Sequence, residues 1–403
     1  MKRFRKQIEK IFEGIFFASS TVTTITIVFI IFFLFKEGLG IFNSSPLEPH
    51  YVIAVNQANP VKKLTSKQLK DIFNEQITNW KILGGNNDSI IHFTTDEVSK
   101  YYTEEQLGSN FENLPKKIDE FISSHPGVVA CFLESYIPKD FKGKIVPVYK
   151  ISLKEFLLGR EWYPTSVPVA QFGTLPLVLG TLWVSIGAIF LALPIGLITA
   201  IYLAEVAGAR FRAFLKPVIE LLAGIPSVVY GFFGLVVLVP LIQKTFNLAV
   251  GETALAGSII LAIMALPTII TISEDAIRTT PQSLKEASLA LGATRWQTLV
   301  RVIIPYSKSG ITAAVILGIG RAVGETMAVL MVTGNAAVMP TSFLQPVRTI
   351  PATIAAELGE ASFGGVHFKA LFALGIILFI ITFIFNLMVD LTRSKNVGNN
   401  KSS

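Results

Sequence analysis

Two ionisable side chains, Arg321 and Glu325, lie in an otherwise uncharged apolar stretch at about residues 310–333. If the stretch is one helix, residues four apart share a face. Ionisable groups inside a membrane span usually face a bundle interior or an aqueous path. Two interpretations follow. Either Arg321 binds an oxyanion while Glu325 positions the guanidinium, or the two form an internal ion pair that joins neighbouring helices.

The composition places these residues in a membrane protein. Of 403 residues, 51% are hydrophobic and only 16% are charged, whereas a soluble chain has about 25% charged residues. The chain holds 35 basic and 28 acidic residues, and 29 of these charges fall within residues 44–162. We therefore expect a soluble insert in a lipid-embedded body. The excess of positive charge lies outside the insert and indicates cytoplasmic loop ends, not a nucleic-acid partner.

Residue types that support metal or redox chemistry are scarce. Cys131 is the single cysteine, and the four histidines are scattered without metal-ligand spacing. We expect no disulfide framework, no metal, no cofactor and no catalytic constellation. A Gly-x4-Gly-Lys-Ser/Thr loop is also absent from the sequence, so the chain is not expected to bind ATP by such a loop.

Six apolar stretches are long enough to cross a bilayer, which takes about 20 residues. They are residues 14–35, about 172–204, 221–243, 253–273, 310–333 and 370–389. A signal peptide would also fit the basic N-terminus, but no small-residue cleavage site ends the first apolar stretch, so we expect an uncleaved helix. Basic residues gather in the N-terminal arm, in the loops after the second and fourth stretches, and in the tail. Both termini are therefore expected in the cytoplasm, with the insert outside.

The loop after the fourth stretch is expected to form two short helices. Thr280 can cap the first helix with Pro281 at its first position. Gly292 would provide a left-handed stop, and Thr294 would cap a second helix that runs to residue 304. Such an amphipathic cytoplasmic element suits docking into a groove of a soluble partner.

This loop carries a recognisable pattern. Its residues read Glu286-Ala287-Ser288-x3-Gly292-x9-Val302-x-Ile304-Pro305. The pattern resembles the coupling loop of importer permeases in the ATP-binding-cassette (ABC) superfamily, E-A-A-x3-G-x9-I-x-L-P. Three positions differ, each by a residue of similar size or character. The resemblance implies that Glu286, Ala287, Gly292 and Pro305 take part in coupling to an ATPase.

Residues 222–234 and 318–328 are similar to the permease subunits of bacterial phosphate importers, the PstC type. The resemblance implies a type I ABC importer permease core of six transmembrane helices in the bacterial plasma membrane. It also implies phosphate as substrate, which Arg321 would meet, and no enzymatic activity in this chain. Its partners would be a second permease subunit, a cytoplasmic ABC ATPase, an extracytoplasmic phosphate-binding protein and membrane lipid.

The fold class expected is thus an α-helical membrane protein with an extracytoplasmic α/β insert. Residues 1–43 would form a cytoplasmic N-terminus and the first transmembrane helix, and residues 44–162 the α/β lobe. Residues 163–392 would form the permease core, with the coupling loop at about 280–305, and residues 393–403 a cytoplasmic tail.

The lobe should contain strands at residues 51–55, 89–93, 128–132 and 145–148. Residues 64–85 and 124–130 resemble parts of a phosphate-binding protein. Such proteins hold phosphate with a Ser/Gly/Thr loop after a strand, but here the loop reads Thr94-Thr95-Asp96-Glu97. Two carboxylates there would repel phosphate. We expect a lobe that has lost ligand binding and serves docking or gating, with retained binding through Thr94 and Thr95 as the alternative.

The sequence is also compatible with two other functions. A membrane sensor would explain the outer lobe but would give the coupling-loop pattern and Arg321 no purpose. An importer of a related oxyanion would share every feature above, because one arginine does not distinguish phosphate from similar anions.

Overall fold

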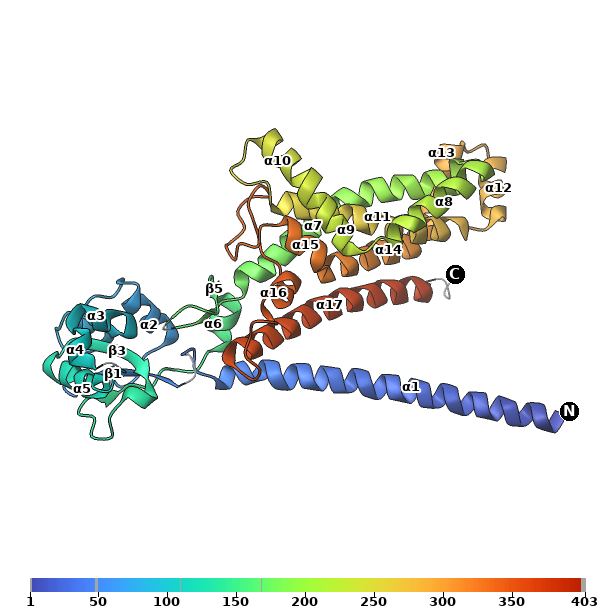
Figure 1. Cartoon of the computed structure of the whole chain (residues 1–403). Coiled ribbons are helices and arrows are strands. Elements are labelled where there is room, and N and C mark those ends of the chain that lie inside the picture. The colour runs from blue at the N-terminus through green and yellow to red at the C-terminus, as the bar shows by residue number, and fades with distance from the viewer. Residues whose placement is uncertain (1, 48–49, 109, 168, 400–403) are drawn as a thin grey trace. The chain divides into compact units, whose positions relative to one another are not determined.

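The computed structural model describes residues 2–47, 50–108, 110–167 and 169–399 (Figure 1). The chain divides into two compact units. The first contains the residues up to Gly173 together with Ala361–Ala373, and the second contains Thr174–Glu360 and the residues from Leu374 onward.

The first unit begins with a long helix, α1 (Lys2–Leu39), which ends in the 3₁₀ turn Gly40–Asn43. Its side chains from residue 12 to residue 30 are exposed, and a helix that is apolar on all sides is typical of a membrane span. Phe33 of α1 packs edge-on against Phe372, near the start of α17 (Val366–Asn399), with ring centroids 5.5 Å apart.

The rest of the first unit is an α/β lobe. Its main sheet has the order β2-β3-β1-β4. The strands are β1 (Tyr51–Val55), β2 (Ile91–Thr94), β3 (Val128–Leu133) and β4 (Lys144–Ile145). The helices are α2 (Ser66–Phe73), α3 (Val98–Tyr101), α4 (Glu104–Leu107), α5 (Leu114–Ser124) and α6 (Leu153–Leu158). The insert expected from the sequence is therefore confirmed as α/β, although β4 covers only two residues.

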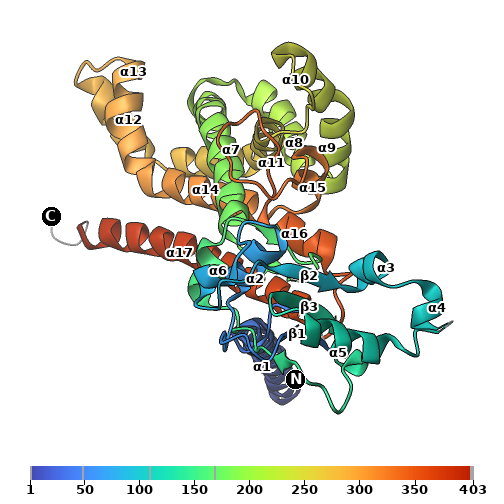
Figure 2. The same cartoon turned by 90° about the vertical axis from the view of Figure 1, so that its left-hand side faces the viewer.

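Alternation along the central strands builds a core on each side of this sheet. Val129 and Cys131 of β3 pack with residues of α2, whereas Ala130 and Phe132 pack with residues of α5. Figures 1 and 2 show α2 and α5 on opposite faces of these strands. β1 pairs antiparallel to β3, and β2 pairs parallel to it.

A second, two-stranded sheet joins β5 (Trp162–Tyr163) to β6 (Gln171–Phe172). Val169, between these strands, is 2% exposed and belongs to the same core as β1 and α2. The packing of the lobe thus continues past Trp162, up to the residues just before the second unit.

The second unit is helical. Its helices are α7 (Leu175–Ile201), α8 (Ala209–Gly224), α9 (Ser227–Phe233), α10 (Val239–Phe246), α11 (Ala254–Arg278), α12 (Gln282–Ala290), α13 (Arg295–Thr298), α14 (Ile304–Gly324), α15 (Met327–Val332), α16 (Ile350–Glu357) and most of α17. The buried α11 packs against both α7 and α14. Glycines allow close approach elsewhere, since a Cβ on Gly231 would lie 3.0 Å from the Cα of Ala328.

Six helical segments of the described chain are long and apolar enough to span a membrane. They are Phe12–Asn43, Leu175–Val206, Ser227–Phe246, Ala254–Arg278, Arg295–Gly324 and Val366–Met388. The six spans expected from the sequence are thus confirmed in number, but the third and fifth differ in extent.

The third span starts at Ser227, because Ile225 and Pro226 have extended backbone and separate it from α8. The fifth span ends at Gly324. Glu325 is extended, with φ −71° and ψ 132°, and a separate helix, α15, follows. The expectation of one continuous helix over residues 310–333 was therefore wrong.

Candidate functional site

The predicted coupling segment forms a helix, a tight turn and a second helical stretch. α12 ends at Ala290, and Gly292 adopts the left-handed conformation, with φ +83°. Thr294 then caps α13. Its hydroxyl accepts a hydrogen bond from the backbone N–H of Gln297, and Oε1 of Gln297 accepts one from the backbone N–H of Thr294. The turn and the second cap predicted from the sequence are thus present.

The first cap differs from the prediction. Pro281, with φ −56° and ψ 134°, precedes α12 as its N-cap residue, so it is not the first helical residue. Thr280 is 4% exposed, and its hydroxyl lies 3.1 Å from that of Ser307. Thr280 therefore joins the start of α12 to α14 and does not cap α12. The second helix also differs, because a π-helical turn, Leu299–Ile303, carries α13 directly into α14.

The coupling segment presents a largely exposed surface. Glu286, Ala287, Gly292 and Pro305, the residues implicated by the family pattern, are all exposed. Large apolar side chains accompany them. Leu291 is 89% exposed and Trp296 is 70% exposed, and Leu284, Leu289 and Val300 are exposed as well. Exposed apolar groups gathered on one short element mark a surface that binds a partner.

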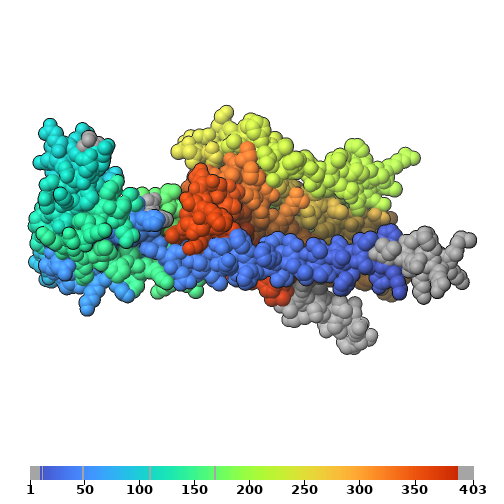
Figure 3. Space-filling view, turned by 60° about the horizontal axis from the view of Figure 1, so that its bottom comes forward, coloured from blue at the N-terminus to red at the C-terminus, as the bar shows by residue number. Residues whose placement is uncertain are grey.

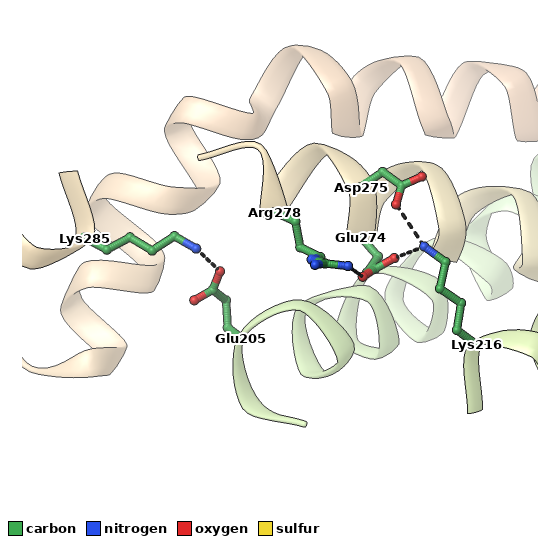
Figure 4. A network of polar contacts seen from close by, with 6 residues as sticks. All are labelled: Glu205, Lys216, Glu274, Asp275, Arg278 and Lys285. Atoms are coloured by element: carbon green, nitrogen blue, oxygen red, sulfur yellow. Dashed lines mark hydrogen bonds and ion pairs between the residues drawn. The ribbon is translucent and has the colours of Figure 1, made fainter. Parts of the chain in front are cut away.

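One ion pair among the described residues joins this segment to α7 (Figure 4). Lys285 of α12 lies 2.6 Å from a carboxylate oxygen of Glu205. Glu205 belongs to the π-helical turn Tyr202–Val206 at the end of α7. Both side chains are more than four-fifths buried, so solvent screens this pair only in part. The contact links α12 directly to α7.

A second cluster centres on Glu274, near the end of α11. Its carboxylate lies 2.6 Å from Nζ of Lys216 and 3.3 Å from Nη1 of Arg278, and only 1% of the side chain is exposed. Lys216, on α8, also pairs with Asp275 at 2.9 Å. Burial alone would lower the pKa of Lys216, but hydrogen bonds to Glu274 and Asp275 raise it overall. Lys216 therefore stays charged and fastens α8 to α11.

Arg321 and Glu325 are placed differently from the prediction. Arg321 lies in the last turn of α14, whereas Glu325 lies beyond the end of that helix, so the two do not share a helix face. Oε1 of Glu325 accepts a hydrogen bond from the N–H of Ala328 at 3.4 Å and thus stabilises the start of α15. Within the described residues, no ion pair joins Arg321 to Glu325.

Arg321 is half-buried. Tyr230 of α9, in the same unit, is 7% exposed, and its hydroxyl donates a hydrogen bond to the carbonyl of Leu222 at 2.8 Å.

A cavity of about 500 Å³ opens at the break between α14 and α15. Gly324 and Thr326, which flank Glu325, line it together with apolar residues of α16, the adjoining turn and α17. The interruption of the fifth span thus exposes backbone and a hydroxyl group in a hollow, which one continuous helix would not do.

Sequence reasoning missed an ion pair near this hollow. Nη1 of Arg348 lies 2.8 Å from Oε1 of Glu357 at the end of α16, and both side chains are mostly buried. The start of α16 is also fixed, because the N–H of Ile350 donates to the hydroxyl of Thr181 on α7. The sequence signal is a pair of opposite charges, Arg348 and Glu357, on either side of a short apolar stretch.

In the lobe, the loop that could hold an anion is already engaged. The backbone N–H and the hydroxyl of Thr94 lie 3.2 and 3.3 Å from Oε2 of Glu97. Thr95, Asp96 and Glu97 form a single 3₁₀ turn after β2. The donors of Thr94 thus face a carboxylate of the chain itself. In the described part of the chain, no group of three or more His, Cys, Asp or Glu residues could hold a metal ion.

Comparison with known proteins defines the class. Residues 192–395 match the family of binding-protein-dependent transport system inner membrane components, and residues 49–150 match the PBP superfamily domain. The first match covers just over half of the chain. The chain therefore belongs to the family of binding-protein-dependent transport inner-membrane components.

The curated relatives are permeases within this family. YqgH of Bacillus subtilis, described as a probable ABC transporter permease, is 42% identical over 61% of this chain and 79% of its own length. The phosphate transport system permease PstC of Mesorhizobium japonicum is 41% identical over 57% of this chain and 75% of its own length. The PstC of Xylella fastidiosa is 38% identical over similar shares. The resemblance to PstC-type permeases predicted from the sequence is thereby confirmed.

Two solved structures are also similar. The inward-facing methionine ABC transporter MetNI matches with a TM-score of 0.43 at 20% identity, over 54% of this chain and 92% of that chain. A phosphate transport receptor from Vibrio cholerae matches with a TM-score of 0.20 at 24% identity, over 27% of this chain and 50% of that chain.

The cluster around Glu274 generates a stability prediction. Glu274→Gln should lower the free energy of unfolding by about 3 kcal/mol, because two cations lose a buried counter-charge. Asp275→Asn removes the other, 60% exposed partner of Lys216 and should cost less than about 1 kcal/mol. Thermal unfolding of the purified protein in detergent measures both. Equal shifts in Tm for the two variants would show that burial of Glu274 contributes nothing.

Proposed function

We propose that this chain is the permease subunit of an ATP-driven phosphate importer in a bacterial plasma membrane. It would couple ATP hydrolysis by a cytoplasmic ABC ATPase to the entry of inorganic phosphate. A second permease subunit and an extracytoplasmic phosphate-binding protein would complete the complex. The observation that carries the proposal is the exposed turn at Gly292 in a chain whose relatives include phosphate transport permeases. Both termini would lie in the cytoplasm, as the distribution of basic residues indicates.

The coupling segment at about residues 280–305 has the chemistry for docking on the ATPase. Its exposed leucines and Trp296 would enter an apolar groove. Glu286 and Ala287 lie on α12 beside this apolar surface, and Pro305 lies at the start of α14. Gly292 sets the angle between the two helical parts because its left-handed conformation disfavours most side chains.

Movement of the docked ATPase would reach the membrane through two contacts. Lys285 connects α12 to the end of α7 through Glu205, and Thr280 connects it to α14 through Ser307. α14 carries Arg321 in its last turn. A displacement of α12 would thus be passed to the helix that bears the proposed substrate residue.

The substrate path is proposed to pass Arg321 and Glu325. In an apolar medium an anion needs a compensating cation, and Arg321 has no carboxylate partner among the described residues, so its charge is available to an anion. Glu325 would act by holding the start of α15, and so by keeping the break in the fifth span open. The ion pair that we had considered as the alternative role is not supported.

The lobe, proposed to comprise about residues 44–162 between the first helix and the permease core at residues 163–392, is assigned to docking or gating. The engaged donors of Thr94 support the view that it no longer binds phosphate. The tail at residues 393–403 would lie in the cytoplasm. A role as a membrane sensor is less well supported, because it leaves the docking surface at Gly292 unexplained.

The coupling role predicts a charge effect at Gly292. Gly292→Asp should reduce phosphate-stimulated ATP hydrolysis of the reconstituted complex about tenfold, the effect of weakening docking by about 1.4 kcal/mol. Gly292→Asn is the matched control, since Asn has nearly the same size and also adopts the left-handed conformation. If Asp and Asn reduced hydrolysis equally, backbone geometry and not the docking surface would be responsible. Unchanged hydrolysis in both would refute this segment as the coupling site.

The substrate role of Arg321 predicts a loss of transport without a loss of assembly. Arg321→Gln should lower the rate of phosphate uptake into proteoliposomes about 10- to 100-fold, because a charge-assisted hydrogen bond of about 1.5–3 kcal/mol is lost. Lys308→Gln removes an exposed charge from the same helix and should leave uptake unchanged. Competition of uptake by arsenate, tungstate and phosphonates would define the anion class. Normal uptake by Arg321→Gln would exclude the proposed path.

The lobe prediction concerns residues 44–173, a fragment that includes Val169 of the lobe core. It should fold, because two apolar cores enclose its sheet, and fluorescence of the buried Trp80 reports folding. Calorimetric titration should detect no phosphate binding at about millimolar concentration, with a genuine phosphate-binding protein as positive control. Saturable binding that disappears in Thr94→Ala/Thr95→Ala would show that the lobe is a receptor.

A further inference from the structure

Exposed apolar side chains lie on α6 and in the residues that follow it in the first unit. Leu153, Leu157 and Leu158 of α6 are 59%, 38% and 56% exposed. Tyr163 of β5 is 50% exposed, and Val167, in the connection to β6, is 63% exposed. We call these five residues the α6 surface. Such a group on a water-soluble lobe would be unfavourable unless something apolar covers it.

The α6 surface is attached to the end of α1. The ring of Phe156, on the buried side of α6, packs edge-on against Phe42 with centroids 5.7 Å apart. The N–H of Ile151 donates to the carbonyl of Ser44 at 3.3 Å, and Nζ of Lys150 lies 3.4 Å from the side-chain oxygen of Asn43. α6 is therefore fixed beside the turn at Gly40–Asn43.

The membrane span in α1 places this turn near the bilayer surface. The uncharged stretch of α1 ends at Phe35, and Lys36 and Glu37 follow. At 1.5 Å per residue, Phe42 lies roughly 9 Å beyond Lys36, and the headgroup layer extends roughly 5–8 Å from the hydrocarbon on each side. Phe42 and the helix attached to it thus fall at the outer margin of that layer.

The exposed surface of α1 continues toward α6. Figure 3 shows the coloured part of α1 at the surface in that view, and Leu39, in its last turn, is still 52% exposed. Lys154 and Arg160, beside the exposed leucines, are exposed as well. Apolar side chains next to basic ones and a tyrosine are the composition of segments that lie in a membrane interface.

We propose that the α6 surface lies in the headgroup region of the outer leaflet. The leucines, Val167 and Tyr163 lie among the headgroups, and Lys154 and Arg160 contact lipid phosphates. The lobe is then held at the bilayer by α6 in addition to its connection to α1. This inference rests on the membrane insertion of α1 and is independent of the transported substrate.

Spin labels on the full chain in lipid nanodiscs test the proposal. Cys131, the single cysteine, is replaced in a Cys131→Ala background, and a label is attached in Leu153→Cys, Leu157→Cys or Leu158→Cys. Collision rates are measured with oxygen, which concentrates in the bilayer, and with a water-soluble nickel chelate. We expect the ratio of oxygen to nickel accessibility at the three positions to be well above the ratio in Ile82→Cys. Ile82 is an equally apolar lobe residue that is 67% exposed and lies outside the α6 surface.

Two outcomes would overturn the proposal. Nickel accessibility at the α6 labels equal to that at Ile82→Cys would show a surface open to water. Low accessibility to both reagents would show that protein and not lipid covers α6. The Tm of each labelled variant, compared with that of the Cys131→Ala parent, establishes that the lobe is folded. Because three positions on the α6 surface are labelled separately, the result does not depend on any one substitution.

Discussion

A carboxylate removed from water must keep a cation beside it, and Glu274 imposes this constraint near the end of α11. Lys216 can reach Glu274 only if α8 lies against α11. Arg278 supplies the second cation from the next turn of α11 itself. Since α11 also packs between α7 and α14, one buried charge fixes the framework on which the coupling segment is mounted.

The C-terminal end of α14 is subject to a different constraint. There the helix stops at Gly324, and the backbone runs extended through Glu325 before α15 begins. An interruption inside an apolar span is tolerated only where the freed polar groups find partners or line a hollow. Here the Glu325 carboxylate supplies one partner and the cavity beside Gly324 supplies the hollow. Polar groups within this apolar span thus gather where the helix is interrupted.

Much of this organisation could be read from the sequence. The lengths of the apolar stretches and the distribution of charges were sufficient to predict the six spans and the α/β insert. Spans and insert both depend on solvation and not on detailed geometry. Gly292 and Thr294 were predictable since the left-handed turn and the capping box are local. Pairings between distant residues were not predictable. Arg321 and Glu325 were expected to pair because an unbroken helix was assumed. The ion pairs that the structure does contain, such as Lys216 with Glu274 or Arg348 with Glu357, depend on how separate helices pack. Thr280 was misjudged for the same reason, because Ser307 lies 27 residues further along the chain.

The contact of Thr94 with Glu97 has a consequence for how the lobe can respond to its surroundings. A group tethered three residues away competes at an effective concentration that linker length sets, of millimolar order for short flexible tethers. A free anion would have to displace the Glu97 carboxylate before it could reach the donors of Thr94. If the lobe has lost phosphate binding, as we propose, its conformation would not change with the supply of phosphate, and it would present the same surface to a partner at every phosphate concentration.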